Sequence, residues 1–272
     1  MNDFVFTTIA VGHPDLESQR GQTHGPDHIF KMSKVLINSI LKYTTATILV
    51  ITDMENRYQR HDRVIFKDIR SFTDQRIIRH GYFDFNLKRF AIKEASDMGK
   101  SYVIYLDADL HLNRNVEKYM RDISSYDVDL WIPRPVNNIG GLLQGDLREE
   151  VFGSMGDLWE DRYRDAPLPA ETLLVFKNDI RKINIFIDTW SRFAEYIVKT
   201  DRLSQRESMY IGVGIMEAGM SMESLADKDL YDLVNSFNIV HTNKVMNHGT
   251  YEMLGMLDYK ELLTSVTGNE YI

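Results

Sequence analysis

The sequence alternates short runs of β-branched and aliphatic residues with longer segments whose apolar positions recur every three or four residues. The first two runs are 4–11 and 45–52, and the segment 29–43 between them has helical spacing. A later run, 102–106, again follows a helical segment, 86–98. Strands that alternate with helices in this way predict an α/β fold, with helices on both faces of a mainly parallel central sheet.

The rest of the sequence fits the same architecture with less regular spacing. We expect further elements at these positions: strands at 63–69, 128–132, 173–176 and 237–240, helices at 115–123, 183–198 and 204–220, and a glycine-rich loop at 137–145. The apolar stripe of helix 183–198 includes Trp190. We interpret this tryptophan as a core residue rather than a platform for a sugar ring.

The composition is that of a globular, enzyme-sized protein. The 272 residues are 43% hydrophobic and 26% charged, which supplies a core and is too apolar for disorder. A net charge of −8 argues against a nucleic-acid partner, which requires clustered Lys and Arg. The chain contains no cysteine, so any metal has to be held by oxygen or imidazole ligands.

The sequence also predicts where the protein resides. It starts without a basic segment followed by an apolar one, the pattern of a signal peptide. Its longest apolar runs are far shorter than a membrane span. We therefore expect a soluble, cytoplasmic protein.

Two aspartates end the most apolar strand of the sequence. The run 102–106 stops at Asp107-Ala-Asp109, which places both carboxylates at the carboxyl edge of the sheet, where open α/β folds bind ligands. Carboxylates one residue apart can share a hard divalent cation, and a diphosphate can supply further oxygens. The structural alternative is that Asp109 only caps the following turn.

Charged residues on two other elements complement this pair. Lys88 and Arg89 lie near the start of the preceding helix, where they can contact metal-bound phosphates through charge-assisted hydrogen bonds. His241 follows the late strand, and imidazole is an acceptable third ligand for Mn²⁺. Each has an alternative role: the cations can pair with Asp84 or Glu94 on a solvated helix face, and the histidine can be a hydrogen-bonded strand end.

The order of these motifs resembles the GT-A glycosyltransferases, most closely the glycogenin and lipopolysaccharide galactosyltransferase group known as family 8. In that group a Lys or Arg on a helix precedes a strand that ends in DxD, and a later strand ends in a metal-binding histidine. The likeness runs over 3–249 and is most specific over 88–112. It implies one Rossmann-like GT-A domain over 1–272, with a nucleotide-sugar half at 1–112, an acceptor half at 113–250 and a tail at 251–272.

The resemblance also implies an activity and a set of ligands. The reaction would be the metal-dependent transfer of a hexose or pentose from a nucleotide sugar, with UDP favoured over GDP, to a glycan or other hydroxyl acceptor. Mn²⁺ or Mg²⁺ would be held by three side chains: Asp107, Asp109 and His241. Donor contacts would come from these residues: Val11, Gly12, Asp53, Lys88, Arg89, Asp107, Lys244 and His248.

Two segments depart from the family pattern on the acceptor side. They are Ala170-Glu171-Thr172 and Gln205-Arg206-Glu207, and each places a glutamate there. Either Glu171 or Glu207 is a candidate general base for an inverting enzyme. The alternative for both is a structural or surface role.

Two other functions fit parts of the pattern. Haloacid-dehalogenase phosphatases also place DxD after a strand, but that strand is normally their first, and they have Thr or Val where this chain has His111. A non-catalytic module that retains a nucleotide-sugar pocket would carry the same residues. Comparing nucleotide release with nucleotide binding separates such a module from an enzyme.

Overall fold

The computed structural model describes residues 3–11, 26–72, 85–112, 114–133, 138–144, 148–200 and 207–225. The strands are β1 (Phe4–Ala10), β2 (Thr47–Thr52), β3 (Val64–Asp68), β4 (Tyr102–Leu106), β5 (Leu130–Ile132), β6 (Leu173–Lys177) and β7 (Met222–Ser224). The α-helices are α1 (Pro26–Tyr43), α3 (Lys88–Ser96), α4 (Glu117–Ile123), α5 (Ile139–Leu142), α6 (Arg148–Met155), α7 (Ile180–Thr200) and α8 (Glu207–Glu217). Short 3₁₀ turns lie at Glu55–Arg57, Ile69–Ser71, Phe85–Leu87, Gly156–Leu158 and Asp161–Asp165.

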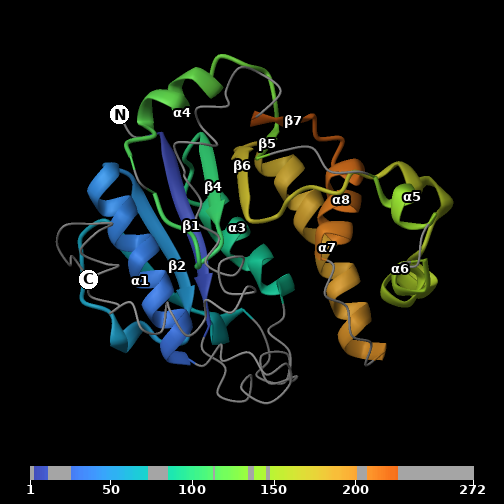
Figure 1. Cartoon of the computed structure of the whole chain (residues 1–272), viewed down its shortest axis with the longest axis horizontal. Helices are drawn as coiled ribbons and strands as arrows, with labels where there is room; N and C mark the ends of the chain where they lie inside the picture. Colours follow the sequence, from blue (N-terminus) through green and yellow to red (C-terminus); the bar gives the residue numbers. More distant parts are fainter. Residues whose placement is uncertain are drawn as a thin grey trace.

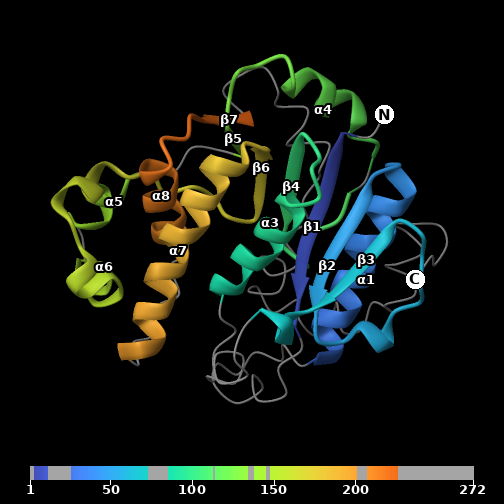
Figure 2. The same ribbon diagram turned by 180° about the vertical axis from the view of Figure 1, so that it is seen from behind.

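Within the described ranges, the strands form one seven-stranded sheet in the order β3-β2-β1-β4-β6-β5-β7; Figure 1 shows the sheet from one side, and β3 is labelled in Figure 2. Parallel pairs join β1 to β2, β1 to β4, β2 to β3 and β5 to β7. Strand β6 runs antiparallel to both β4 and β5. The predicted α/β class with a mainly parallel central sheet flanked by helices is therefore confirmed.

The antiparallel strand β6 brings a distant segment to the end of β4. Its first residue, Leu173, pairs with Leu106, the last residue of β4. The amide of Asp107 consequently donates to the carbonyl of Thr172, at 3.0 Å. The turn that contains Glu171 thus lies beside the aspartate that follows β4.

Two apolar clusters cover the two faces of the sheet. Even-numbered residues of β1, such as Phe6, pack with α1 and α4, while odd-numbered residues, such as Val5, pack with α3, α7 and α8. Figure 2 shows α3 and α7 on the face opposite α1. All of β1 is buried because helices cover both of its faces. Each fully buried large aliphatic side chain contributes roughly 1.5–3 kcal/mol.

Helix α7 fixes the start of α3. The indole of Trp190 is fully buried, and its Nε1 donates to the side-chain oxygen of Asn86 at 2.7 Å. Asn86 lies in the 3₁₀ turn that leads into α3. The prediction that Trp190 is a core residue is confirmed, and its hydrogen bond helps to place the first turn of α3.

Helix α8 packs closely on its neighbours through two glycines. A Cβ on Gly212 would lie 1.8 Å from the carbonyl oxygen of Pro167, and one on Gly214 would lie 2.8 Å from the ring of Phe186. Neither position tolerates a side chain without movement of its neighbour. The glycines therefore fix α8 against α7 and the segment before β6, and with it Glu207, the first residue of α8.

The predicted elements differ from the structure in the second half of the chain. The expected loop at 137–145 contains α5, whose first turn is capped by the Asn138 side chain accepting from the amide of Gly141 at 3.0 Å. Helix α6 and strand β7 carried too few periodic residues to be predicted. The late strand expected at 237–240 lies outside the described residues.

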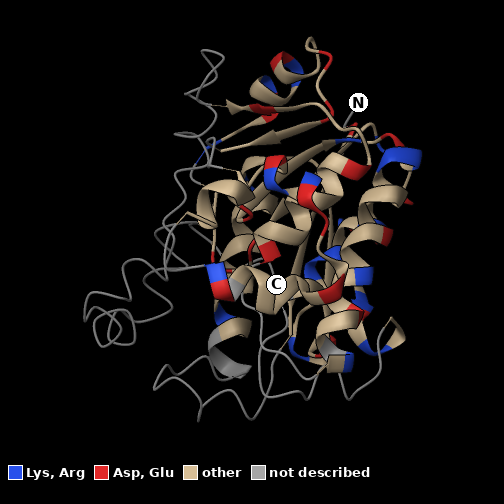
Figure 3. Ribbon diagram, turned by 90° about the vertical axis from the view of Figure 1, so that its right-hand side faces the viewer, with Lys and Arg blue, Asp and Glu red and all other residues tan. Residues whose placement is uncertain are grey.

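Charged positions are spread over the described part of the chain. Figure 3 shows acidic and basic residues interspersed along the helices, while the strands carry few of either sign. No helix in the described ranges is both long and apolar enough to cross a bilayer.

Candidate active site

The carboxyl ends of β1 and β4 lie side by side at the point where the strand order reverses. From β1 the chain proceeds through β2 to β3 on one side of the sheet, and it then returns to place β4 on the other side of β1. Open α/β sheets bind ligands at such a point, outside the carboxyl ends of the strands. Val11 follows β1 and Asp107 follows β4, so the structure brings these two predicted residues to this edge. Gly12 lies outside the described residues.

The centre of this edge is a buried lysine between two carboxylates. The Lys88 ammonium lies 3.0 Å from Oδ1 and 3.3 Å from Oδ2 of Asp107, and 3.1 Å from Oε1 of Glu207. Lys88 is 3% exposed and Glu207 is 4% exposed. Because water cannot solvate this ammonium, the two carboxylates have to stabilise it.

The position of Lys88 at the start of a helix increases its need for carboxylate partners. Lys88 is the first residue of α3, where the helix dipole disfavours a positive charge. Burial by itself lowers the pKa of Lys88, but Asp107, Glu207 and Glu171 together raise it well above its ordinary value. Lys88 is therefore charged throughout the physiological range. Glu207 begins α8, where the dipole favours a negative charge.

Asp109 is the second carboxylate after β4 and, unlike Asp107, it is buried. It is 9% exposed, and burial together with the nearby charge of Asp107 raises its pKa to about 7, while Lys88 lowers it. Two carboxylates this close are an oxygen-donor pair that Mn²⁺ or Mg²⁺ accepts, and a divalent cation would relieve their repulsion. The residues therefore fit the predicted metal.

A third protein ligand is not provided by this part of the structure. Among the described residues, no group of three His, Cys, Asp or Glu side chains is arranged to hold a metal ion. His241, the predicted third ligand, lies outside the described residues, as do Lys244 and His248. Their roles stay predictions.

Glu171 lies at the rim of the same cluster. It is partly exposed and precedes β6, whose first residue pairs with the end of β4. Burial raises the pKa of Glu171, Asp107 adds to the increase, and Lys88 opposes it. Burial likewise raises the pKa of Glu207 to about 7, against the effect of Lys88. The structure therefore brings both predicted glutamates to the aspartates, one at the surface and one in the interior.

Arg89 makes local contacts at the start of α3. Its guanidinium donates to the carbonyl of Asn86 and lies 4.3 Å from the ring centroid of Phe90. It is buried, like Lys88 beside it. Its predicted contact with donor phosphates stays a prediction.

Tyr105 is a residue of this site that the sequence analysis missed. Its hydroxyl donates to Oδ1 of Asp107 at 2.8 Å, and the Lys88 ammonium lies 5.8 Å from its ring centroid. Because side chains alternate along a strand, Tyr105 and Asp107 point to the same face. This period of two was a signal that could have identified the tyrosine.

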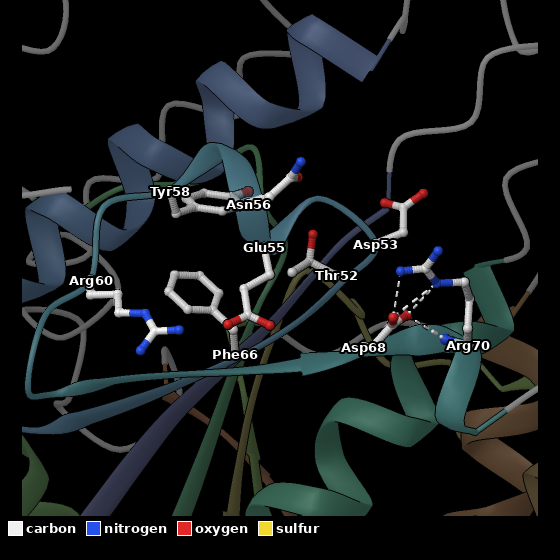
Figure 4. Close-up of a pocket in the computed structure, with 9 residues that line it drawn as sticks. All are labelled: Thr52, Asp53, Glu55, Asn56, Tyr58, Arg60, Phe66, Asp68 and Arg70. Atoms are coloured by element: carbon white, nitrogen blue, oxygen red, sulfur yellow. Dashed lines mark hydrogen bonds and ion pairs between the residues drawn. The ribbon is translucent and has the colours of Figure 1, made fainter.

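A pocket of about 670 Å³ lies at the carboxyl ends of β2 and β3. It is lined by Thr52, Asp53, Glu55, Asn56, Tyr58, Arg60, Phe66, Asp68 and Arg70 (Figure 4). Asp53, predicted as a nucleoside contact, is one of them. The others were missed, although a polar cluster directly after a buried parallel strand was a usable signal.

The two ends of this pocket differ in chemistry. At one end the rings of Tyr58 and Phe66 stack with centroids 4.9 Å apart, and the Tyr58 hydroxyl is hydrogen-bonded to Ser33 at 2.6 Å. At the other end Arg70 pairs with Asp68 through its Nε, at 2.8 Å from both carboxylate oxygens (Figure 4). The pocket therefore offers an aromatic surface beside polar groups, a combination that suits a planar polar ligand.

Comparisons with known proteins add the following. No protein-family model matches the chain, and no curated protein sequence matches it. Mouse xyloside xylosyltransferase 1 in its apo form is similar in structure, with a TM-score of 0.45 and 10% identity over 86% of this chain and 93% of that chain. The galactosyltransferase LgtC in complex with donor and acceptor sugar analogues has a TM-score of 0.45 and 11% identity over 81% and 73%. At these values neither structure assigns a function to this chain.

Proposed function

We propose that this protein is a metal-dependent glycosyltransferase of the GT-A type. It would move a hexose or pentose from a nucleotide sugar, with UDP favoured, to a glycan or other hydroxyl acceptor. The observation that carries this proposal is the buried Lys88 in contact with Asp107 and Glu207, with Asp109 and Glu171 beside them, at the edge where the strand order reverses. The leaving group of a nucleotide sugar is a nucleoside diphosphate, and carboxylates that can hold a divalent cation suit its negative charge.

The aspartates would prepare the donor side of the site. Asp107 and Asp109 would hold Mn²⁺ or Mg²⁺, whose charge stabilises the leaving diphosphate. Lys88 and the Tyr105 hydroxyl fix the carboxylate of Asp107, which lies directly after a rigid strand. Arg89 would contact donor phosphate or sugar, and replacing it with alanine should weaken donor affinity by about 1.5–3 kcal/mol.

The pocket beside β2 and β3 supports the nucleoside end of the donor. It opens on the same carboxyl edge as Asp107, two to three strands away, and neighbouring strands lie about 4.8 Å apart. That separation is close to the span from a diphosphate to its base. Asp53 would contact the ribose or base, and the Tyr58 and Phe66 rings would form the wall of the base pocket.

Between the two glutamates, exposure favours Glu171 as the general base. A base must reach the acceptor hydroxyl, and Glu171 is partly exposed whereas Glu207 is almost entirely buried. The raised pKa of Glu171 brings it closer to the value at which a carboxylate accepts a proton efficiently near neutral pH. An inverting course would use it in this way.

The residues outside the described ranges complete the proposal. His241 would be the third metal ligand, Gly12 would contact the nucleoside, and Lys244 and His248 would contact the diphosphate. Replacing His241 with alanine should lower Mn²⁺ affinity and flatten its loss at acidic pH, because a neutral imidazole has to bind the metal. His248→Ala should mainly affect diphosphate binding.

The test combines binding and turnover. The protein is incubated with Mn²⁺ and a panel of UDP- and GDP-sugars, and both thermal stabilisation and released nucleotide are measured. We expect one UDP-sugar to stabilise the fold and to be hydrolysed slowly without acceptor. Asp109→Asn should abolish release, while Asp97→Asn, an exposed carboxylate on the turn after α3, should not. Full release by Asp109→Asn would overturn the metal assignment.

The same experiment separates the alternatives. Specific stabilisation without any nucleotide release would identify a binding module rather than an enzyme. Release of phosphate from a phosphomonoester, lost in Asp107→Asn, would identify a phosphatase of the haloacid-dehalogenase type. The position of the DxD motif after the fourth strand, rather than the first, favours the glycosyltransferase.

A further inference from the structure

The buried ion cluster raises a question of charge. Asp107 is needed for the cation in the proposed function, yet it already contacts an ammonium through both of its oxygens. An isolated Lys88–Asp107 pair would be neutral, and such a carboxylate attracts a cation only weakly. Glu207 changes this balance, because it contacts the same ammonium at 3.1 Å from the opposite half of the chain.

We propose that Glu207 is a positioning residue that shares Lys88 with Asp107 and thereby keeps Asp107 available to a divalent cation. This inference rests on the proposed function, since it concerns the metal site of that function. It assigns to Glu207 a role that acts through Lys88, in place of proton transfer to a substrate.

Burial and distance support this role. Glu207 is 4% exposed, so an acceptor hydroxyl has little access to it. An ammonium has three donors, and the observed contacts direct them to carboxylates on two elements, the end of β4 and the start of α8. With Asp109 and Glu171 included, one lysine is surrounded by four carboxylates, which leaves a net negative charge to attract a divalent cation.

The placement of α8 makes the contact rigid. Gly212 and Gly214 let α8 lie directly against the segment before β6 and against α7. Trp190 on α7 in turn fixes the turn that leads into α3. Both ends of the Lys88–Glu207 contact are therefore held by the packing of the same helix, so the glutamate can set the position of the ammonium.

The test measures Mn²⁺ binding rather than turnover. Free Mn²⁺ is quantified by electron paramagnetic resonance at about pH 8, where the carboxylates are ionised, with and without UDP. We expect Glu207→Gln to bind Mn²⁺ about tenfold more weakly than the parent, although it does not touch the metal. Lys88→Met should bind Mn²⁺ at least as tightly as the parent. In that background Glu207→Gln should have no further effect, because the shared ammonium is gone.

The control is Glu94→Gln on α3, the helix of Lys88, which removes the carboxylate partner of Lys67 and should leave Mn²⁺ affinity unchanged. If the parent binds Mn²⁺ and Glu207→Gln binds equally well, this inference is wrong and the proposed function stands. If the loss is the same with and without Lys88, Glu207 acts through the fold and the inference is equally wrong. If the parent binds no Mn²⁺, the metal site fails and the inference fails with it.

Should Glu207→Gln alone fail to fold, the double variant Lys88→Met, Glu207→Gln decides the question. It lacks both the ammonium and its second partner, so Asp107 keeps its full charge. We expect its Mn²⁺ affinity to equal or exceed that of the parent. Weaker binding would overturn the proposal.

Discussion

Two groups of ion pairs lie at the carboxyl edge of the sheet, one buried and one exposed to solvent. Lys88 meets Asp107 and Glu207 in the interior, with the lysine 3% exposed. Arg70 meets Asp68 at the rim of the pocket, with side chains 55% and 37% exposed. Arg70 makes more hydrogen bonds with its partner than Lys88 does, but water solvates both charges of the Asp68–Arg70 pair. Burial, rather than the number of contacts, therefore decides how much each grouping contributes to stability.

The difference also bears on function. A buried cluster is costly to build, because each charge loses its hydration, so it persists where the position of a charge matters. An exposed pair is inexpensive, and a ligand can compete with it for the arginine. We therefore expect the inner cluster to affect folding and the metal, and the outer pair to affect only the ligand of the pocket.

The largest expected effect comes from removing the ammonium. Lys88→Met leaves the buried Glu207 and the partly exposed Asp107 without a counter-charge, which should cost about 3–5 kcal/mol of unfolding free energy at neutral to alkaline pH. Urea unfolding at about pH 8 measures this loss. The control is Lys93→Met, which breaks the exposed Lys93–Asp97 pair on the same helix and should cost a few tenths of a kcal/mol at most. Equal losses in both variants would contradict the distinction.

The next effect is a dependence of stability on pH. The pKa of Glu207 is raised from 4.5 to about 7 in the folded protein, mainly by burial, so between these values the folded state holds a proton that the unfolded state releases. The contribution of Glu207 to stability is therefore largest below about pH 4.5 and declines as pH rises to about 7. The total is roughly 3 kcal/mol.

This dependence is isolated by comparison with Glu207→Gln. The unfolding free energy of the parent minus that of the variant should fall as pH rises from about 4 to about 8. Asp109 and Glu171 have raised pKa values as well, but they are present in both proteins. A difference that rises with pH would mean that Lys88 holds Glu207 ionised against burial, and it would reverse the sign argued here.

A smaller effect is expected from the hydroxyl that reaches the same cluster. Tyr105→Phe removes the hydrogen bond to Asp107 without changing the buried ring, which should cost about 1.5–3 kcal/mol because the acceptor is charged. Tyr102→Phe, on the same strand with its side chain partly exposed, is the matched control. Thermal unfolding of both variants is the measurement, and a loss as large in Tyr102→Phe would show that the contact with Asp107 has no special value.

The two halves of the chain explain what could be predicted from the sequence. Strands β1, β2 and β4 are nearly continuous runs of apolar and β-branched residues because they are buried on both faces. Their positions and the edge that carries Asp107 therefore followed from pattern alone. Strand β7 has only three residues and α6 has little amphipathic character, so their patterns are too short or too weak. The positions of secondary-structure elements were therefore predicted correctly where the residues of one element carry a strong pattern by themselves.

The site followed the same rule. Lys88, Asp107 and Asp109 were singled out because each lies on, or directly after, a segment with a strong apolar pattern. The contact of Lys88 with Glu207 joins residues 119 positions apart, and it depends on how α8 packs on α7. No local pattern encodes that distance. The sequence therefore identified the charged groups and suggested functions for them, whereas only the fold showed which of them lie in contact.

The smallest effect on stability is expected at the outer pair. Arg70→Ala should leave the urea midpoint almost unchanged, because both charges of the Asp68–Arg70 pair remain in water when they separate. The Arg70 contact lowers the pKa of Asp68, and without it that pKa should return toward 3.8, a change that lies below the neutral range.

The expected consequence of Arg70→Ala is confined to the pocket. Calorimetry should show weaker UDP binding in Arg70→Ala, whereas Arg121→Ala on the exposed face of α4 should bind UDP like the parent. If Arg70→Ala unfolds at a markedly lower urea concentration, the Asp68–Arg70 pair contributes to stability as Lys88 does, and the contrast between the buried cluster and the exposed pair is wrong. Unchanged UDP affinity would instead place the nucleoside elsewhere on the edge.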